Sequence, residues 1–178
     1  MEIVDKVDIN DQVIGVTNKV EAHENGYIHR VAAIFVFTPD NNLLVQLRKK
    51  DGLMDHSVGG HVKQGESYDE AALRELKEEL GIDAEIKNLG TFYGDEIMPN
   101  RNLKIDHYFG FYESKLTNEG IKQINIAKNE VAMMIPMKLE DLSVEMRKAQ
   151  EKFTIGFIRT FNFYIVKHKL TIPLAELK

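Results

Sequence analysis

Three glutamates that lie close together in the sequence are the residues best suited to chemistry in this chain. Glu75, Glu78 and Glu79 fall within one turn of a segment with strong helix signals. At about 100° per residue, a helix places these carboxylates on one narrow arc. Each pair of like charges three or four residues apart costs a helix about 0.2–0.5 kcal/mol. A helix face that is only solvated therefore explains the pattern poorly. Oxygen ligands gathered in this way suit Mg²⁺ or Mn²⁺, which commonly hold phosphate groups.

The residues around the three glutamates predict the ends of this helix. Ser67 and Glu70 have the spacing of a capping box, which predicts a helix that begins near Tyr68. Gly81 follows the segment as a C-terminal cap in the left-handed conformation. Arg74 lies one turn from acidic residues on either side, so it is expected to brace their carboxylates.

The same helix is expected to carry an apolar stripe and a face that approaches a ligand. Leu73, Leu76 and Leu80 form the stripe, which is expected to lie roughly opposite the glutamates. Ala71 lies one turn before Glu75, and its small side chain is expected to leave room for a metal ion or a phosphate. Glycines ahead of the helix allow the backbone to approach a ligand closely, and these are Gly59, Gly60 and Gly65.

The segment from Gly60 to Ile82 resembles the Nudix box, G-x5-E-x7-R-E-U-x-E-E-x-G-U, in which U is aliphatic. Its fixed positions are all filled, by Gly60, Glu66, Arg74, Glu75, Leu76, Glu78, Glu79, Gly81 and Ile82. A weaker resemblance extends over most of the chain. The resemblance implies an α/β fold, the α/β/α sandwich with a mixed sheet. It also implies a hydrolase that uses Mg²⁺ or Mn²⁺ to cleave a diphosphate bond.

The resemblance further implies roles for the residues of the box. Glu78 and Glu79 are implied as ligands of the catalytic metal, with help from the carbonyl of Gly59 or Gly60. Glu75 is implied as a further ligand or as the base that orients water. The alternative for these acids is a solvated helix face.

Two further acids and one arginine complete the expected active site. Glu66 is expected either to bind a second metal or to pair with Arg74, whose bracing of the acids serves both structure and catalysis. Glu130 precedes the last expected strand and is a candidate for the late acid that many family members use as a base or a metal ligand. Other acids compete for that role, with a surface loop as the alternative for each: Asp95, Glu96 and Asp106.

Outside the box, the chain resembles the branch of the family that contains isopentenyl-diphosphate isomerase. The resemblance lies in residues 7–15, in the segment from 23 to 30, and in residues 57–66. In that isomerase, a catalytic cysteine stands directly before a glycine–histidine pair. Gly59 occupies this position here, which argues against isomerase chemistry.

The same resemblance implies a metal site at His23, His29 and His61, since histidines at comparable places bind a metal in the isomerase. The alternative is that His29 packs at the start of a strand and His61 makes a hydrogen bond within its loop. Spacing gives no argument for the remaining histidines, which are interpreted as ordinary: His56, His107 and His168.

Composition excludes several classes of function. The chain has 178 residues, a net charge of −5 and no cysteine. Disulfides, thiolate zinc sites and cysteine nucleophiles are therefore excluded. No basic field favours extended nucleic acid or an anionic membrane, and no apolar run approaches the ~20 residues of a membrane span. The charged N-terminus does not resemble a signal peptide, so a cytoplasmic protein is expected.

Hydrophobic patterning predicts one domain over residues 1–178, with an N-terminal strand hairpin at 1–28, a core at 29–150 and a C-terminal helix at 151–178. Polar loops are expected at 23–29 and 51–63, and an interruption between two strands is expected at 99–102. Strands are expected in the hairpin and at 31–38, 43–49, 89–95, 105–113 and 131–138. Beyond the box, helices are expected at 139–150 and 154–168. Aromatic residues at helical spacing in the last segment indicate a core face or a homodimer contact.

Three functions follow as hypotheses. The first is a Mg²⁺-dependent hydrolase of a small diphosphate compound, such as a nucleoside diphosphate derivative. The second is an enzyme similar to isopentenyl-diphosphate isomerase, and the third is a Nudix-type module that binds a nucleotide without cleaving it. Substrate selection is expected to depend on residues 93–106 and on the C-terminal helices.

Overall fold

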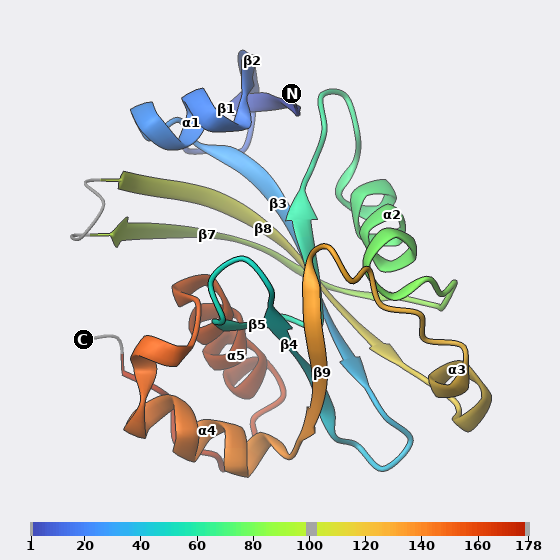
Figure 1. The fold of residues 1–178 in the computed structure, drawn as a ribbon. Helices are drawn as coiled ribbons and strands as arrows, with labels where there is room; N and C mark the ends of the chain where they lie inside the picture. The colour runs from blue at the N-terminus through green and yellow to red at the C-terminus, as the bar shows by residue number, and fades with distance from the viewer. Residues whose placement is uncertain (1, 99–102, 177–178) are drawn as a thin grey trace.

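The protein is described by a computed structural model, which covers residues 2–98 and 103–176, without the side chains of residues 95–105. The described chain forms a nine-stranded mixed sheet with helices on both faces (Figure 1). The strands are β1 Ile3–Val7, β2 Val13–Asn18, β3 His29–Phe37, β4 Leu43–Arg48, β5 Met54–Asp55, β6 Val58–His61, β7 Lys87–Met98, β8 Leu103–Lys115 and β9 Val131–Met137. The helices are α1 Lys19–Asn25, α2 Tyr68–Leu80, α3 Asn118–Lys122, α4 Leu139–Lys148 and α5 Ile155–Lys167, with a 3-10 turn at Gln150–Lys152.

Strand β3 organises the sheet. It pairs in parallel with β8 along its whole length, and it pairs antiparallel with β1, β6 and β4 on its other side. β7 continues the sheet beyond β8, and β9 continues it beyond β4. One long central strand therefore holds the N-terminal hairpin and the segment before α2 in fixed register.

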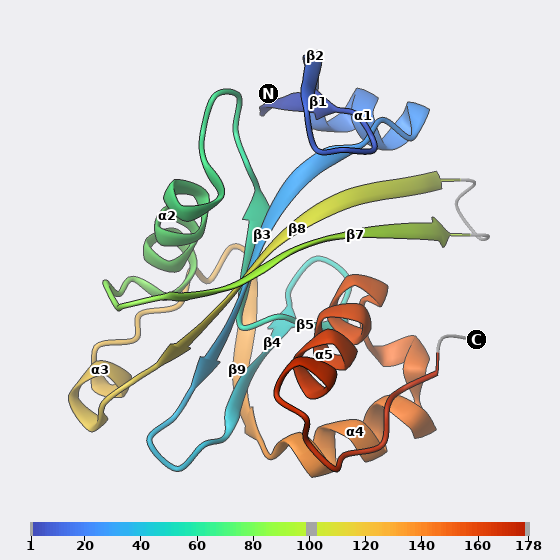
Figure 2. The ribbon, with the colours of Figure 1, turned by 180° about the vertical axis from the view of Figure 1, so that it is seen from behind.

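Alternate residues of β3 face two separate cores, because successive side chains of a strand point to opposite faces. Ala33 and Phe35 face the core that includes α4 and α5. Ala32 and Ile34 face the core that includes α2. Helices thus cover both faces of the sheet, as the view from behind also shows (Figure 2). The expected α/β/α sandwich with a mixed sheet is confirmed.

Aromatic side chains dominate the core under α5. Phe157 and Phe161 are fully buried, and Tyr164 is nearly so. Each buried phenylalanine contributes about 1.5–3 kcal/mol to the hydrophobic stabilisation of the fold. The aromatic face predicted for this helix therefore packs against the sheet within the chain.

Helix α2 begins and ends where the sequence predicts. The Ser67 side chain accepts a hydrogen bond from the Glu70 backbone, and the Glu70 carboxylate accepts one from the Ser67 backbone at 2.8 Å. Gly81 ends the helix with a φ of 70°. Both signals depend only on residues close in the sequence, so they can be recognised without knowledge of the tertiary structure.

The predicted faces of α2 are wrong in one respect. Glu75 and Glu79 are only 8% and 5% exposed, and they do not lie opposite the apolar stripe. At about 100° per residue, both fall between Ala71 and Leu76, in the middle of the buried arc. This side of α2 faces the glycine-containing strand β6, where absent side chains leave space for carboxylates.

Two other expectations for α2 also need correction. Leu73 is 48% exposed, because it falls about 20° beyond Leu80, at the edge of the buried arc. Ala71 is fully buried in the core under α2, so its small size serves helix–sheet packing and leaves no open space for a ligand.

The loops expected at residues 23–29 and 51–63 contain regular structure. Helix α1 is capped at its start by Asn18, whose side chain accepts from the Glu21 backbone, and at its end by Gly26, which has a φ of 64°. These cap signals were present in the sequence, but a helix of seven residues has little periodicity. β5 and β6 are too short to be recognised by alternation and form by pairing with β4 and β3. The interruption expected between two strands at 99–102 lies outside the described residues.

In the described part of the chain, no helix has the length and apolar character needed to cross a membrane.

Substitution Ser67→Ala tests the capping box of the helix that carries the acids. The change removes the hydroxyl that accepts from the Glu70 backbone. We expect the free energy of unfolding to fall by about 1 kcal/mol, measured by urea denaturation. Thr171→Ala, at an exposed position outside the helices, serves as the control. Equal losses in both variants would contradict a specific role for the cap.

Candidate functional site

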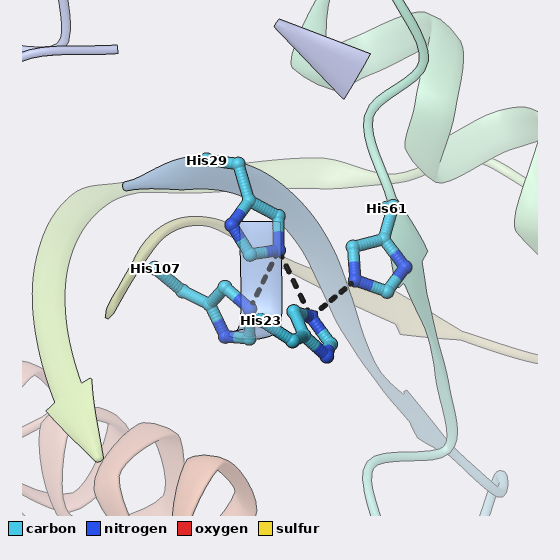
Figure 3. Close-up of side chains that lie close together, drawn as sticks. All are labelled: His23, His29, His61 and His107. Carbon is cyan, nitrogen blue, oxygen red and sulfur yellow. Dashed lines mark hydrogen bonds between the residues drawn. The ribbon is translucent and has the colours of Figure 1, made fainter. Parts of the chain in front are cut away.

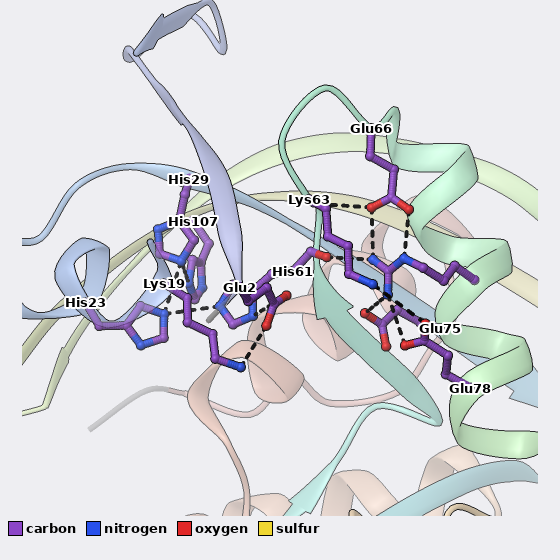
Figure 4. A network of polar contacts seen from close by, with 11 residues as sticks. Glu2, Lys19, His23, His29, His61, Lys63, Glu66, Glu75, Glu78 and His107 are labelled. Carbon is purple, nitrogen blue, oxygen red and sulfur yellow. Dashed lines mark hydrogen bonds and ion pairs between the residues drawn. The ribbon is translucent and has the colours of Figure 1, made fainter. Parts of the chain in front are cut away.

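Arg74 is the centre of the acidic cluster on α2. Its guanidinium donates to both carboxylate oxygens of Glu66, at 2.8 and 2.9 Å. One terminal nitrogen also donates to Glu75 at 2.6 Å and to Glu78 at 3.2 Å. The other terminal nitrogen donates to the backbone carbonyl of His61 at 2.9 Å. One cation thus holds three carboxylates and strand β6 together (Figure 4).

Gly60 is required by the close approach of Glu75 to β6. A Cβ atom at residue 60 would lie 2.1 Å from a carboxylate oxygen of Glu75. The neighbouring Gly59 is less constrained, because the nearest atom to a Cβ there is the Ala32 carbonyl oxygen at 3.5 Å. Register places both glycines opposite β3, with Gly60 paired to Ala32. The first glycine of the box therefore makes room for an acid of the same box.

Within the acidic cluster, Glu79 has the most strongly raised pKa. Burial, followed by the negative charge of Glu75, raises its pKa from the ordinary value of 4.5 to about 8. A hydrogen bond from Gln46 at 2.7 Å works in the opposite direction. Burial also raises the pKa of Glu75, against the influence of Arg74. The buried side of α2 therefore holds more negative charge than its environment stabilises.

The donor chemistry of this cluster fits a divalent cation. Glu75, Glu78 and Glu79 offer carboxylate oxygens, and the glycines of β6 offer backbone carbonyls, which are the ligands that Mg²⁺ and Mn²⁺ prefer. A cation would also relieve the repulsion between Glu75 and Glu79. In this structure the Glu75 carboxylate accepts from Arg74, and the Glu79 carboxylate accepts from Gln46.

The candidates for the late acid lie in different environments. Glu130 is exposed, and its carboxylate accepts from the Asn129 amide at 3.0 Å. Its negative charge makes a small contribution to the raised pKa of Glu79. Asp106 is 2% exposed on β8. The side chains of Asp95 and Glu96 lie outside the described residues.

Four histidines form a second cluster, at the N-terminal end of β3. His23 comes from α1, His29 from β3, His61 from β6 and His107 from β8. Their ligand nitrogens all lie within 4.8 Å of one another (Figure 3). The structure thus brings together the three histidines that the resemblance to the isomerase indicated.

His107 is the member of this cluster that the sequence analysis missed. It was interpreted as ordinary, but the parallel pairing of β3 with β8 sets it directly opposite His29. Only the register of these two strands could have revealed it. The other two ordinary histidines lie outside the cluster: His56 contacts Thr160 at 2.7 Å, and His168 stacks on Tyr164.

Burial keeps the clustered imidazoles neutral. It lowers the pKa of His29 to about 4 and lowers the pKa values of His61 and His107 well below their usual range. Nδ1 of His29 lies 2.8 Å from the Tyr27 carbonyl, to which it donates. This hydrogen bond leaves Nε2 of His29 with a free lone pair that points into the cluster.

Comparison with known proteins supports a family assignment. The family model described as NUDIX domain matches residues 27–161. The isopentenyl-diphosphate Delta-isomerase 2 of Photorhabdus laumondii is 31% identical over 166 residues, which cover 90% of this chain and 91% of that protein. An uncharacterized Nudix hydrolase of Clostridium acetobutylicum is 31% identical over 170 residues, with 88% of this chain and 80% of that protein covered.

Solved structures show the same fold. A crystal structure from Deinococcus radiodurans superposes with a TM-score of 0.68 at 21% identity and covers 96% of this chain and 99% of that one. The E. coli dihydroneopterin triphosphate pyrophosphohydrolase gives a TM-score of 0.58 at 16% identity, with 77% and 94% covered. The family model spans more than half of the residues, from the start of β3 to α5, and this chain therefore belongs to the Nudix family.

Proposed function

We propose that this protein is a Mg²⁺-dependent hydrolase that cleaves a diphosphate bond in a small compound, such as a nucleoside diphosphate derivative. The observation that carries the proposal is the complete acidic cluster, in which Arg74 gathers Glu66, Glu75 and Glu78 beside the buried Glu79. Similarity to uncharacterized Nudix hydrolases is consistent with a hydrolase of this kind.

The residues of the cluster have distinct proposed roles. Glu78 and Glu79 would hold the cation with the carbonyl of Gly59 or Gly60, with Glu75 as a further ligand or as the base. Bound Mg²⁺ would supply positive charge that neutralises a diphosphate. A carboxylate, either Glu75 or the late acid Glu130, orients a water molecule and accepts its proton as the oxygen attacks phosphorus. The bond from that phosphorus to the bridging oxygen breaks, and two phosphate-bearing products leave.

Arg74 is proposed as a positioning residue. Its five hydrogen bonds fix the direction of Glu66, Glu75 and Glu78 relative to the carbonyl of His61. Glu66, with both oxygens on Arg74, anchors the guanidinium in this structure, and the same hydrogen bonds lower the pKa of Glu66. Because Arg74 holds both oxygens of Glu66, we propose that Glu66 supports the first metal site indirectly, through Arg74. Binding of a second metal by Glu66 is the alternative, and it would require Arg74 to move.

Isomerisation of a prenyl diphosphate is a second candidate. Its support is the identity of 31% over 90% of this chain with the isopentenyl-diphosphate Delta-isomerase 2 of Photorhabdus laumondii, together with the histidine cluster. The absence of cysteine and the presence of Gly59 argue against it. A third reading, nucleotide binding without cleavage, is disfavoured because the acidic residues of the box are complete.

The hydrolysis test compares the wild-type protein with Glu78→Gln. Both receive a panel of diphosphate compounds with Mg²⁺, including nucleoside diphosphate derivatives, dinucleoside polyphosphates and isopentenyl diphosphate. We expect kcat/KM to fall by about 10²-fold or more, because Glu78 is a proposed metal ligand. Product identification by mass spectrometry names the broken bond. Glu119→Gln, 75% exposed on α3, is the matched control.

Two results would contradict the hydrolase. One is a wild-type protein that leaves the whole panel intact while binding a nucleotide. The other is the appearance of an allylic isomer of isopentenyl diphosphate without hydrolysis products.

Substitution Gly60→Ala tests the contact between β6 and Glu75. The new methyl group would occupy space 2.1 Å from the Glu75 carboxylate, so this side chain must move away from the cation. We expect kcat/KM to fall by more than about tenfold while the melting temperature stays near that of the wild type. Gly59→Ala keeps its carbonyl and meets no atom closer than 3.5 Å, so a smaller loss is expected there. Equal losses would show that the Glu75 contact is unimportant.

The raised pKa of Glu79 predicts how the stability of metal-free protein depends on pH. The unfolded carboxyl titrates near 4.5 and the folded one near 8, so the folded state binds more protons between these values. The free energy of unfolding should therefore decrease as pH rises from about 4.5 to 8. Glu79→Gln should remove much of this decrease in thermal denaturation with a chelator present, while Glu119→Gln should retain it. A Glu79→Gln profile as steep as that of the wild type would contradict the assignment.

A further inference from the structure

The His56 side chain is a polar ring inside the aromatic core under α5. It is only 7% exposed. Three phenylalanine rings pack around it with centroids 5.4–6.3 Å away, and these belong to Phe35, Phe109 and Phe157. A buried polar group is costly unless its polar atoms find partners. The partners of His56 therefore show which parts of the chain this ring holds together.

Both ring nitrogens of His56 are engaged. Nδ1 lies 2.7 Å from the Asp55 carboxylate, to which it donates. Nε2 lies 2.7 Å from the hydroxyl of Thr160, a fully buried residue of α5. The hydroxyl donates to Nε2 when the ring is neutral and accepts from Nε2 when the ring is charged. The link between His56 and α5 therefore persists in either protonation state.

Asp55 connects this link to β4 and to the start of α5. Its carboxylate accepts from Thr154, the N-cap residue of α5, at 2.7 Å and from Arg48 on β4 at 2.8 Å. Burial alone would raise the pKa of Asp55, but the nearby His56 and Arg48 lower this pKa well below its usual range. The Asp55 carboxylate is therefore ionised, and it accepts strong, charge-assisted hydrogen bonds.

These hydrogen bonds hold a corner of the chain at which strand pairing changes. Residues 55–57, called here the β5–β6 corner, lead from β5, which pairs with β4, to β6, which pairs with β3. The third residue of the corner, Ser57, is fully buried, and its hydroxyl accepts from the Val36 backbone at 2.8 Å. Each residue of the corner thus makes a side-chain hydrogen bond to another element.

The β5–β6 corner leads directly into the strand against which the acids lie. A Cβ atom at Gly59 would lie 3.7 Å from Nδ1 of His56, and a Cβ atom at Gly156 of α5 would lie 3.7 Å from Cε1 of the same ring. The ring therefore packs between β6 and α5. Gly60, the next residue of β6, is the one that makes room for Glu75. A displacement of the corner would move the backbone of both β6 glycines relative to the acids.

We propose that His56 is a positioning residue of the acidic site, which fastens the β5–β6 corner to α5 through Asp55 and Thr160 and thereby sets where β6 presents the carbonyls of its glycines to the cation. The fastening of the corner stands independently of the reaction. The part that concerns the cation rests on the proposed function.

Substitution Thr160→Val tests this role, because it removes the hydroxyl and keeps a branched side chain of similar size. The substrate is the compound of the hydrolysis panel that the wild type cleaves fastest. We expect kcat to fall about tenfold and the Mg²⁺ concentration for half-maximal activity to rise about fivefold, since the β6 carbonyls shift relative to the acids. KM for the compound should stay within about twofold of the wild type. Thr160→Ser retains the hydroxyl and should restore kcat and the Mg²⁺ dependence.

Ser143→Ala is the matched control for a role in stability alone. Ser143 is also fully buried, and its hydroxyl donates to the Pro173 carbonyl, which joins α4 to the C-terminal segment. This variant should lose melting temperature as Thr160→Val does, with kcat and Mg²⁺ dependence unchanged. Melting curves establish that each variant is folded, and His56→Asn replaces Thr160→Val if the latter does not fold.

Three results would overturn the positioning role. One is a Thr160→Val protein with the kcat and Mg²⁺ dependence of the wild type. Another is a Thr160→Ser protein as impaired as Thr160→Val. The third is an equal impairment of Ser143→Ala, which would reduce the effect to a loss of stability.

Hydrogen exchange with a chelator present tests the fastening of the corner without an activity measurement. Thr160→Val should speed the exchange of backbone amides at residues 55–61 at least about tenfold, whereas Ser143→Ala should leave them unchanged. Wild-type exchange at 55–61 in Thr160→Val would show that the corner is not held in this way. If the wild type cleaves nothing in the panel, the part about the cation fails with the proposed function, and exchange still decides the fastening.

Discussion

The burial of two carboxyl groups on the inward side of α2 is the constraint on which the rest of the site depends. Glu75 and Glu79 lie in the arc that a helix normally fills with apolar residues, and burial raises the pKa of both. Such an arrangement is stable only with compensating cations and hydrogen bonds. Arg74 and Gln46 supply part of this compensation, and the glycine backbone of β6 supplies the space. The remaining negative charge is what a divalent cation would neutralise.

Features set by local interactions were predictable from the sequence. The capping box at Ser67, the cap at Gly81 and the nearly continuous apolar run of β3 each depend on residues close in the chain, and each is confirmed. The sandwich of helices around a mixed sheet followed from the resemblance carried by the box. Helix α1 was missed although Asn18 and Gly26 mark its ends, because seven residues give too little periodicity to outweigh a polar composition.

Features that depend on tertiary packing could not be predicted in the same way. Amphipathic reasoning separates apolar from charged residues, so it placed Leu73 in the apolar stripe and the glutamates opposite that stripe, whereas Glu75 and Glu79 are buried and Leu73 is exposed. No local sequence pattern shows that a glycine of β6 lies against the Glu75 carboxylate. Likewise, His107 has no neighbour in sequence that marks it as a member of the histidine cluster, and its place opposite His29 follows only from strand register.

The parallel pairing of β3 with β8 has a consequence for the order in which the molecule matures. His29 and His107 meet across a separation of 78 residues, and contacts of such long range form late because a large loop must close first. Ribosomal synthesis delivers α1, β3 and β6 well before β8 emerges. The imidazole cluster is therefore incomplete until β8 has paired with β3.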